Sequence, residues 1–190
     1  MTGPFPDVLH LGCGRSKYPL APAFGVDAVA GPAVDLVWDL DEHPWPLPDG
    51  VFGKVYLVNV LEHLADVVGT MEEIHRVCRP GAEVVILAPA ASSHHLWTDV
   101  THRRAFLSRS FQYFDSRFAD ERFSYTGARF EVLETTYERY EDWIWVFRPK
   151  WWERLLLGWV NRHLDLYERR FLYWYQTRNL YVRLRAVKGA

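Results

Sequence analysis

The sequence predicts an α/β protein with a doubly wound, mostly parallel sheet. Three observations support this fold class. Several short apolar runs lack strict alternation, which is typical of strands covered on both faces. A periodic helix lies between two of these runs, as in a crossover unit. Polar residues follow the ends of four successive runs, where open parallel sheets bind their ligands.

Seven strands are expected. They fall at residues 7–11, 24–29, 33–38, 53–58, 82–88, 130–137 and 179–187. The first five are short apolar runs bounded by turn residues. The last alternates apolar and polar residues, which predicts a half-exposed strand.

The clearest helix lies between the fourth and fifth strands. Asp66 is its expected N-cap, and Val67, Met71, Ile74 and Cys78 recur at helical spacing before the stop at residues 79–81. Two further helices are expected, near 110–117 and from 151 to about 175, the second interrupted near 161–163. Residues 90–104 read as a polar, histidine-rich loop.

Length and composition restrict the function classes. The 190 residues suggest a single domain, 1–190, and the net charge of −2 argues against a uniformly basic nucleic-acid binder. Two cysteines, Cys13 and Cys78, favour a reducing compartment, so the expected location is the cytoplasm. The first residues do not resemble a signal peptide, and no apolar run approaches the roughly 18 residues of a membrane span.

The near-neutral charge hides two unequal parts. Residues 1–149 carry 13 Lys and Arg against 21 Asp and Glu, whereas residues 150–190 carry 9 against 3. Of the 30 aromatic residues, 14 lie between Tyr137 and Tyr181. The aromatic, basic segment at 150–176 is open to several interpretations: a helical layer on the sheet, a lid over an acceptor pocket, a dimer contact or a membrane-surface face.

The candidate site is formed by the strand ends. Gly12-Cys13-Gly14 follows the first strand, and Asp27, Asp39 and Asn59 end the next three. A carboxylate at the end of the second strand can accept both hydroxyls of a ribose. A lone Gly-x-Gly is equally compatible with a tight turn, and Lys17 stands where a dinucleotide fingerprint has its third glycine. The pattern suits a ligand that has a ribose but no pyrophosphate.

Four stretches together resemble a class I SAM-dependent methyltransferase of the small-molecule (type 11-like) group. They are residues 8–14, 38–52, 58–64 and 75–81, in the order and spacing of that family. The resemblance implies a Rossmann-like sheet of strand order 3-2-1-4-5-7-6 with strand 7 antiparallel. It also implies S-adenosyl-L-methionine as the methyl donor.

The same resemblance implies roles for the strand-end residues. Gly12 and Gly14 let the backbone approach the methionine part, Asp27 holds the ribose hydroxyls, and Asn59 lies near the sulfonium. On the adenine side, Asp39 accepts from the amino group and Leu40 lies against the ring. Leu11, Cys13 and Ala28 complete the cofactor-binding set.

The sequence departs from the family in two places. His10 stands where the family usually has an acidic residue that faces the ammonium group of the cofactor. Only six residues precede Asp7, so the helix that usually precedes the first strand is expected to be lacking.

A hydroxyl or amine acceptor must lose a proton, and histidine suits that task near neutral pH. The candidates are Glu62 and His63, followed by His94, His95, Asp99 and His102 in the loop after the fifth strand. His102 is the first choice, because the loop lies at the carboxyl edge of the sheet. Glu62 and His63 could instead cap the next helix. Asn59-x-x-Glu62-His63 resembles a metal-binding pattern of some methyltransferases, but an asparagine replaces one anionic ligand, so no metal is expected.

The sequence therefore predicts a SAM-dependent enzyme that methylates a small molecule, such as a sugar, a polysaccharide precursor or a secondary metabolite. A non-catalytic SAM- or SAH-binding module acting through the aromatic C-terminal surface is the alternative, and a nicotinamide oxidoreductase is a third. No nucleic-acid partner is expected, and peripheral membrane contact and a homodimer stay open.

Overall fold

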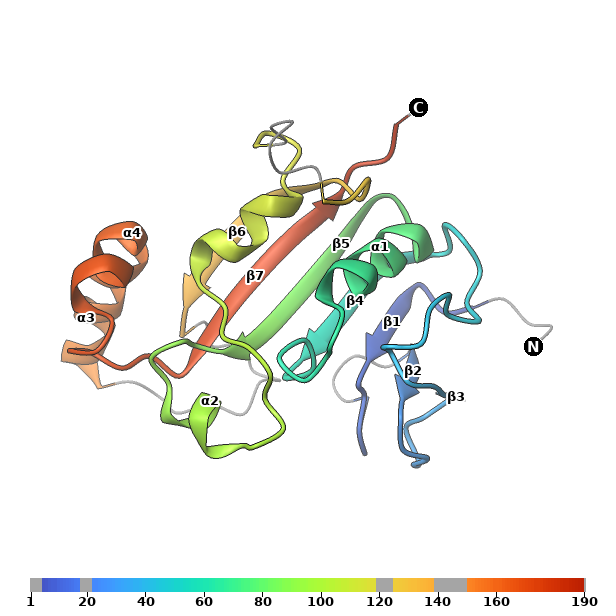
Figure 1. Cartoon of the computed structure of the whole chain (residues 1–190), viewed down its shortest axis with the longest axis horizontal. Helices are drawn as coiled ribbons and strands as arrows, with labels where there is room; N and C mark the ends of the chain where they lie inside the picture. Colours follow the sequence, from blue (N-terminus) through green and yellow to red (C-terminus); the bar gives the residue numbers. More distant parts are fainter. Residues whose placement is uncertain (1–4, 18–21, 119–124, 139–149, 190) are drawn as a thin grey trace.

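A computed structural model describes residues 5–17, 22–118, 125–138 and 150–189. Its centre is a seven-stranded sheet of order β3-β2-β1-β4-β5-β7-β6 (Figure 1). The strands are β1 (Val8–Leu11), β2 (Ala23–Asp27), β3 (Leu36–Val37), β4 (Phe52–Val58), β5 (Cys78–Pro89), β6 (Phe130–Tyr137) and β7 (Asn179–Ala186). The expected fold class and strand order are confirmed.

Strand directions bring the candidate residues to one edge. β3, β2, β1, β4 and β5 pair in parallel, and β7 is antiparallel to both β5 and β6. Parallel neighbours end at the same edge, so the segments after β1, β2, β3, β4 and β5 meet there. In Figure 1 this is the lower edge, beside α2 (His94–Thr98).

The helix between β4 and β5 is α1 (Val67–Val77). Its N-cap is Asp66, as expected, because a carboxylate oxygen of Asp66 accepts a hydrogen bond of 2.9 Å from the Gly69 amide. Met71, Ile74 and Val77 are fully buried against the sheet, so the apolar period places this helix on one face.

Several expected boundaries change. β3 pairs with β2 over only two residues, and β5 begins at Cys78, four residues before the predicted start, because Cys78 pairs with Phe52. The predicted helix near 110–117 is a 3₁₀ segment, η1 (Ser108–Phe114). The C-terminal helix breaks where expected: α3 (Trp151–Arg162) is followed by α4 (Leu164–Leu166) and a π-helical turn, η3 (Tyr167–Phe171).

The main core lies between one face of the sheet and α1, η1, α3 and η3. Its largest fully buried members include Phe52, Phe111, Phe130, Tyr137 and Tyr167. A smaller cluster of Tyr56, Val85, Leu87 and Tyr181 lies on the second face. β7 shows the expected alternation only in its second half, because its first half is buried on both faces between β5 and β6.

Among the described residues, no helix is long and apolar enough to span a bilayer. The expectation about a helix before β1 falls on residues 1–6, of which 1–4 lie outside the described residues. The same holds for the aromatic residues between 139 and 149.

Candidate functional site

The turn after β1 requires glycine at its first position. Gly12 adopts a φ of +64°, in the left-handed region that favours glycine. A Cβ atom at this position would overlap the side chain of Val60, which lines the neighbouring cavity. Gly14 has a φ of +57°, but the space around it is open. The backbone at Gly12 is therefore accessible from the cavity only because no side chain stands there.

The carboxylate of Asp27 is held in place by this turn. Its Oδ2 accepts a hydrogen bond of 2.8 Å from the Gly14 amide, and its Oδ1 accepts one of 3.0 Å from the Val29 amide. Each oxygen keeps a second acceptor position, so two vicinal hydroxyls could donate to the pair. This arrangement suits a ribose at the end of β2.

A cavity of about 480 Å³ connects the predicted cofactor residues. It is lined by Gly12, Asp27, Ala28, Val29, Trp38, Asp39, Leu40, Asn59, Val60, His63 and Leu64. The cavity thus gives access to the backbone of Gly12 and to the carboxylate of Asp27, and Asp39 and Leu40 line it beyond β3. This combination fits a nucleoside joined to an amino-acid chain. Leu11 and Cys13 do not line it, because both side chains are buried in the interior.

His10 is buried beside this loop. Burial lowers the pKa of His10 to about 4, with the charge of Asp27 acting in the opposite direction, so the imidazole is neutral near pH 7. Among the described residues, its Nδ1 atom has no hydrogen-bond partner. A neutral ring nitrogen can accept a hydrogen bond from an ammonium group, and it does not repel a cation.

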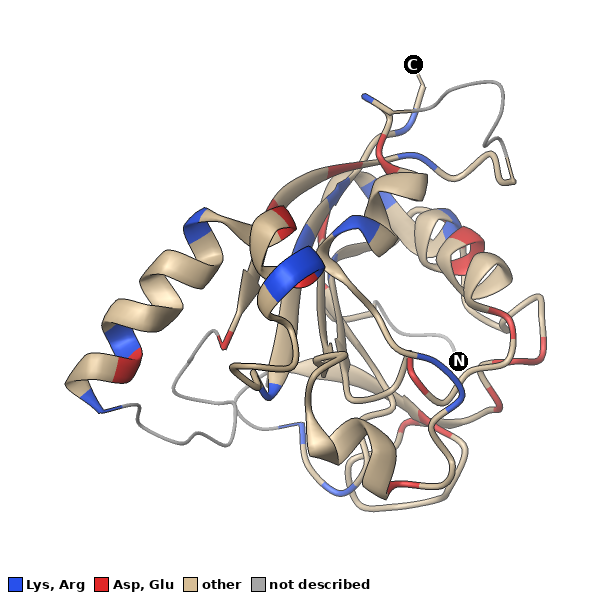
Figure 2. Cartoon of the chain, turned by 60° about the vertical axis from the view of Figure 1, so that its left-hand side comes forward, with Lys and Arg blue, Asp and Glu red and all other residues tan. Residues whose placement is uncertain are grey.

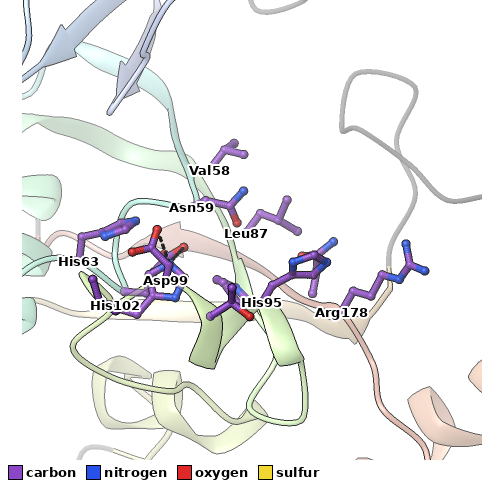
Figure 3. A pocket seen from close by; sticks show the side chains of 13 residues that line it. Val58, Asn59, His63, Leu87, His95, Asp99, His102 and Arg178 are labelled. Carbon is purple, nitrogen blue, oxygen red and sulfur yellow. Dashed lines mark ion pairs between the residues drawn. The ribbon is translucent and has the colours of Figure 1, made fainter.

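A second, larger cavity of about 840 Å³ lies beside the first. Its walls come from the ends of β4 and β5, from α2 and the loop after it, and from the start of β7. Figure 3 shows His63, Asp99 and His102 gathered at one end and Arg178 at the other, with Asn59 between them. Asn59 and His63 line both cavities, so the two cavities meet at these side chains.

Glu62 is the buried acid of this second cavity. Its side chain is 0% exposed, and within the described ranges neither carboxylate oxygen has a hydrogen-bond partner. Burial raises the pKa of Glu62 to about 7, while the nearby His102 lowers it. The carboxyl group is therefore poised to exchange a proton near neutral pH.

Hydrogen bonds fix the tautomer of His102. Its Nδ1 lies 2.9 Å from the carbonyl oxygen of Leu96, which only accepts, so Nδ1 carries a proton. The other nitrogen, Nε2, lies 3.9 Å from Oε1 of Glu62 and 3.9 Å from Oδ2 of Asp99. In the neutral ring, Nε2 presents its lone pair between two carboxyl groups.

His63 is oriented in the same way by a short chain of hydrogen bonds. The Thr101 hydroxyl donates to Asp99 at 2.7 Å, so it accepts from Nδ1 of His63 at 2.9 Å. Burial, together with the neighbouring His102, lowers the pKa of His63. Thr101 also holds the pKa of the Asp99 carboxyl below its usual range.

The structure therefore brings Glu62, His63 and His102 together, although His102 is 40 positions from Glu62 in the sequence. Asp99 and His95 also line the cavity, whereas His94 is exposed and is not among its lining residues. Ligand atoms of Glu62, His63 and His102 lie within 4.8 Å of one another, a spacing that a divalent cation could bridge. The alternative capping role of Glu62 is not seen, because Asp66 caps α1.

Sequence reasoning missed residues that hold the site in shape. Lys17 forms an ion pair with Asp35, whose carboxylate also accepts from the Gly25 amide at 2.7 Å. Asp41 accepts from the Ala65 and Asp66 amides at 2.9 and 3.1 Å, which ties the segment after β3 to the start of α1. The sequence shows Asp41 only as an acidic residue in a loop. Nothing near it in the sequence indicates that it binds the amide of Ala65, 24 residues away.

Comparisons with known proteins agree with this geometry. The sequence model described as a methyltransferase domain matches residues 9–86. This stretch, a little under half of the chain, is similar to a methyltransferase domain. It covers the glycine turn, Asp27, Asp39, Asn59, Glu62 and α1. No curated protein sequence matches the chain.

Solved structures share the fold across nearly the whole chain. A SAM-dependent methyltransferase from Archaeoglobus fulgidus is 16% identical with a TM-score of 0.54, over 94% of this chain and 85% of that one. One from Mesorhizobium loti is 16% identical with a TM-score of 0.53, over 94% and 90%. The 1,6-didemethyltoxoflavin-N1-methyltransferase of Burkholderia thailandensis, solved with its acceptor and S-adenosylhomocysteine, is 13% identical with a TM-score of 0.54, over 95% and 71%.

The family model thus supports the recognition as a class I SAM-dependent methyltransferase over residues 9–86, and the solved structures confirm the fold. The roles of individual residues stay predictions.

Proposed function

We propose that the protein transfers a methyl group from S-adenosylmethionine to an oxygen or nitrogen of a small molecule held in the larger cavity. The observation that carries the proposal is that Asn59 and His63 line both cavities. A donor in the smaller cavity and an acceptor in the larger one would meet at these two side chains. The volume of about 840 Å³ is in the range of small-molecule sites.

The cofactor site is assigned to the smaller cavity. Asp27 would accept both ribose hydroxyls, Asp39 would accept from the adenine amino group, and the backbone of Gly12 would lie along the methionine part. Neutral His10 would accept from the ammonium group in place of the usual carboxylate. When bound, S-adenosylmethionine supplies an already activated methyl group, so the protein must mainly align donor and acceptor, which can be worth about 7–11 kcal/mol.

The proton of the acceptor is assigned to His102. Its Nε2 presents a lone pair to the cavity, and the imidazolium that forms on proton uptake would lie between the carboxyl groups of Glu62 and Asp99, each 3.9 Å away. Thr101 and the Leu96 carbonyl keep the His63 and His102 rings oriented. A positioned base of this kind contributes roughly 10²–10⁴-fold to the rate.

The lining suggests a polar acceptor. Hydrogen-bonding side chains, Asn59, Thr98, Asp99 and Asn179 among them, surround the space. Such a lining suits a molecule rich in hydroxyl groups, such as a sugar, a polysaccharide precursor or a polar secondary metabolite.

The test is methyl transfer from radiolabelled S-adenosylmethionine to fractions of a metabolite extract. His102→Gln should lower kcat by at least 100-fold while leaving the affinity for the cofactor unchanged. His94→Gln is the matched control, because His94 lies in the same loop but is exposed. Full turnover in His102→Gln would remove the assigned base. Activity that is lost on adding a chelator and restored by Mg²⁺ or Mn²⁺ would instead make Glu62, His63 and His102 metal ligands.

A further inference from the structure

The C-terminal arm of the protein, residues 151–174, carries apolar side chains that the described part of the chain leaves uncovered. Trp151 is 75% exposed, Leu155 is 69% exposed and Trp174 is 86% exposed. Buried residues of α3, Leu157 and Val160, lie on the opposite side of the helix, so α3 is apolar on both its inner and its outer side. A helix that only packs on the core has one apolar face and a polar outer face, so the outer tryptophans of α3 are not explained by packing within the fold.

Six side chains of the arm form one connected cluster, in which Trp159 is half-buried and the others are exposed. On α3, Trp151, Trp152, Leu155 and Trp159 recur at helical spacing along one stripe. The ring of Trp159 lies 5.6 Å from that of Phe171, edge to face, and Phe171 lies 6.2 Å from Trp174. These ring contacts join the helix stripe to the turn after η3. We call these six residues the aromatic patch.

Cationic side chains lie on the same arm as the aromatic patch. Arg154, Arg162, Arg169 and Arg170 are all exposed. Figure 2 shows blue segments on the helix of this arm. Within the described ranges, no carboxylate lies at ion-pair distance from Arg154, Arg162 or Arg170, whereas Arg169 pairs with Asp165 at 3.0 Å.

The other two acids of the arm, Glu153 and Glu168, accept hydrogen bonds from neutral donors. Glu153 accepts from the Lys150 amide at 2.6 Å, and Glu168 accepts from Ser108 and from the hydroxyl of Tyr137. All four arginines of the arm are exposed, whereas Asp165 is the one exposed acid among its three, so the solvent-facing side is aromatic and carries a net positive charge.

We propose that the aromatic patch docks this protein onto the surface of an anionic lipid bilayer. Tryptophan rings favour the boundary between headgroups and acyl chains, and flanking arginines favour anionic headgroups. Both requirements are met on one arm of the fold. A symmetric dimer through the same patch would bring the arginines of one copy against those of the other, which like charge disfavours.

Docking of this kind would affect the acceptor cavity. Arg178, which lines that cavity, follows Trp174 by four residues, or at most about 14 Å of extended chain. Tyr167, the buried residue of η3, donates to the Tyr175 carbonyl at 2.6 Å and so fixes the segment between the patch and the cavity. The lipid surface would thus lie near one wall of the site.

The test is co-sedimentation of the full chain with vesicles of phosphatidylcholine alone and of phosphatidylcholine with 30% phosphatidylserine. We expect binding to the mixed vesicles that weakens with salt. Trp151→Ser with Trp174→Ser should weaken it by about tenfold or more, since each ring buries a large apolar surface. Arg154→Gln with Arg170→Gln should weaken it by about 25-fold, at roughly fivefold for each cation.

Tyr125→Ser is the matched control, because Tyr125 is exposed but lies outside the arm. Its vesicle binding should equal that of the unaltered protein. All variants change exposed side chains, so their thermal midpoints should agree, which shows that they fold. No binding to the mixed vesicles, or equal loss in Tyr125→Ser, would overturn the proposal. A dimer that forms without vesicles and is lost in the tryptophan variant, with no vesicle binding, would overturn it in favour of a second copy of the chain. Failure of methyl transfer leaves this test unaffected.

Discussion

Glu62 makes the stability of the protein depend on pH in a predictable direction. Its ordinary pKa of 4.5 rises to about 7 in the folded protein because burial disfavours the charged form. Between these two pH values the folded protein holds a proton that the unfolded chain has released. The free energy of unfolding should therefore fall as the pH rises from about 4.5 to about 7, and this contribution should level off above that.

Glu62→Gln removes this ionisation while keeping the shape of the side chain. At 1.36 kcal/mol per unit of pKa, the advantage of the variant over the unaltered protein should grow by roughly 2–3 kcal/mol between pH 5 and pH 8. The Glu62 side chain is 0% exposed, so solvent does not screen this contribution to the free energy of unfolding. Taking the difference between the two proteins at each pH cancels the contributions of all other titrating groups.

The assay is urea unfolding at pH 5, 6, 7 and 8, followed by the fluorescence of the nine tryptophans. Glu42→Gln, at an exposed carboxyl, is the matched control and should change stability by less than about 0.5 kcal/mol at each pH. A Glu62→Gln difference that stays constant with pH would exclude a raised pKa of Glu62 in the folded protein. It would mean that His102 keeps Glu62 ionised in the folded protein despite its burial.

Three further changes probe the site and the fold. Gly12→Ala should destabilise the protein more than Gly50→Ala and should weaken S-adenosylmethionine binding at least tenfold, since both glycines have positive φ but only a Cβ at Gly12 overlaps a neighbour; equal stability losses in thermal unfolding would contradict this. His10→Asp should tighten S-adenosylmethionine binding about tenfold in calorimetry, as an ionised acceptor strengthens a hydrogen bond from an ammonium group; weaker binding would mean that the cofactor ammonium lies elsewhere. Asp66→Ala should lower the free energy of unfolding by about 1 kcal/mol through loss of the N-cap of α1, and an unchanged urea midpoint would show that the cap contributes nothing.

The arrangement of the sheet could be predicted because local pattern and family resemblance agreed. Unalternated apolar runs marked β1 to β5, and the periodic positions of α1 together with Asp66 gave that helix nearly to the residue. Strand ends that depend on pairing with another strand were harder to predict. β5 starts at Cys78 because of its partner Phe52, and a pairing partner is not visible in a local window.

The candidate site could be predicted only in part, because some of its contacts also join residues that are distant in the sequence. The strand-end residues Asp27, Asp39 and Asn59 were found because parallel strands end together. By contrast, the full burial of Glu62 and its approach to His102 depend on how the loop after β5 folds back, and the sequence shows only that both residues can titrate. The ring contacts that join Trp159 to Phe171 and Trp174 likewise depend on the breaks after α3.

Calorimetry with S-adenosylhomocysteine shows whether this fold binds the cofactor with Asp27 on the ribose. We predict binding to the unaltered protein and a loss of about 1.5–3 kcal/mol in Asp27→Ala, the range for hydrogen bonds to a charged group. Asp49→Ala is the matched control, since Asp49 is exposed and pairs with Arg76. No binding at millimolar ligand would exclude this cofactor, and equal binding by Asp27→Ala would place the ribose elsewhere.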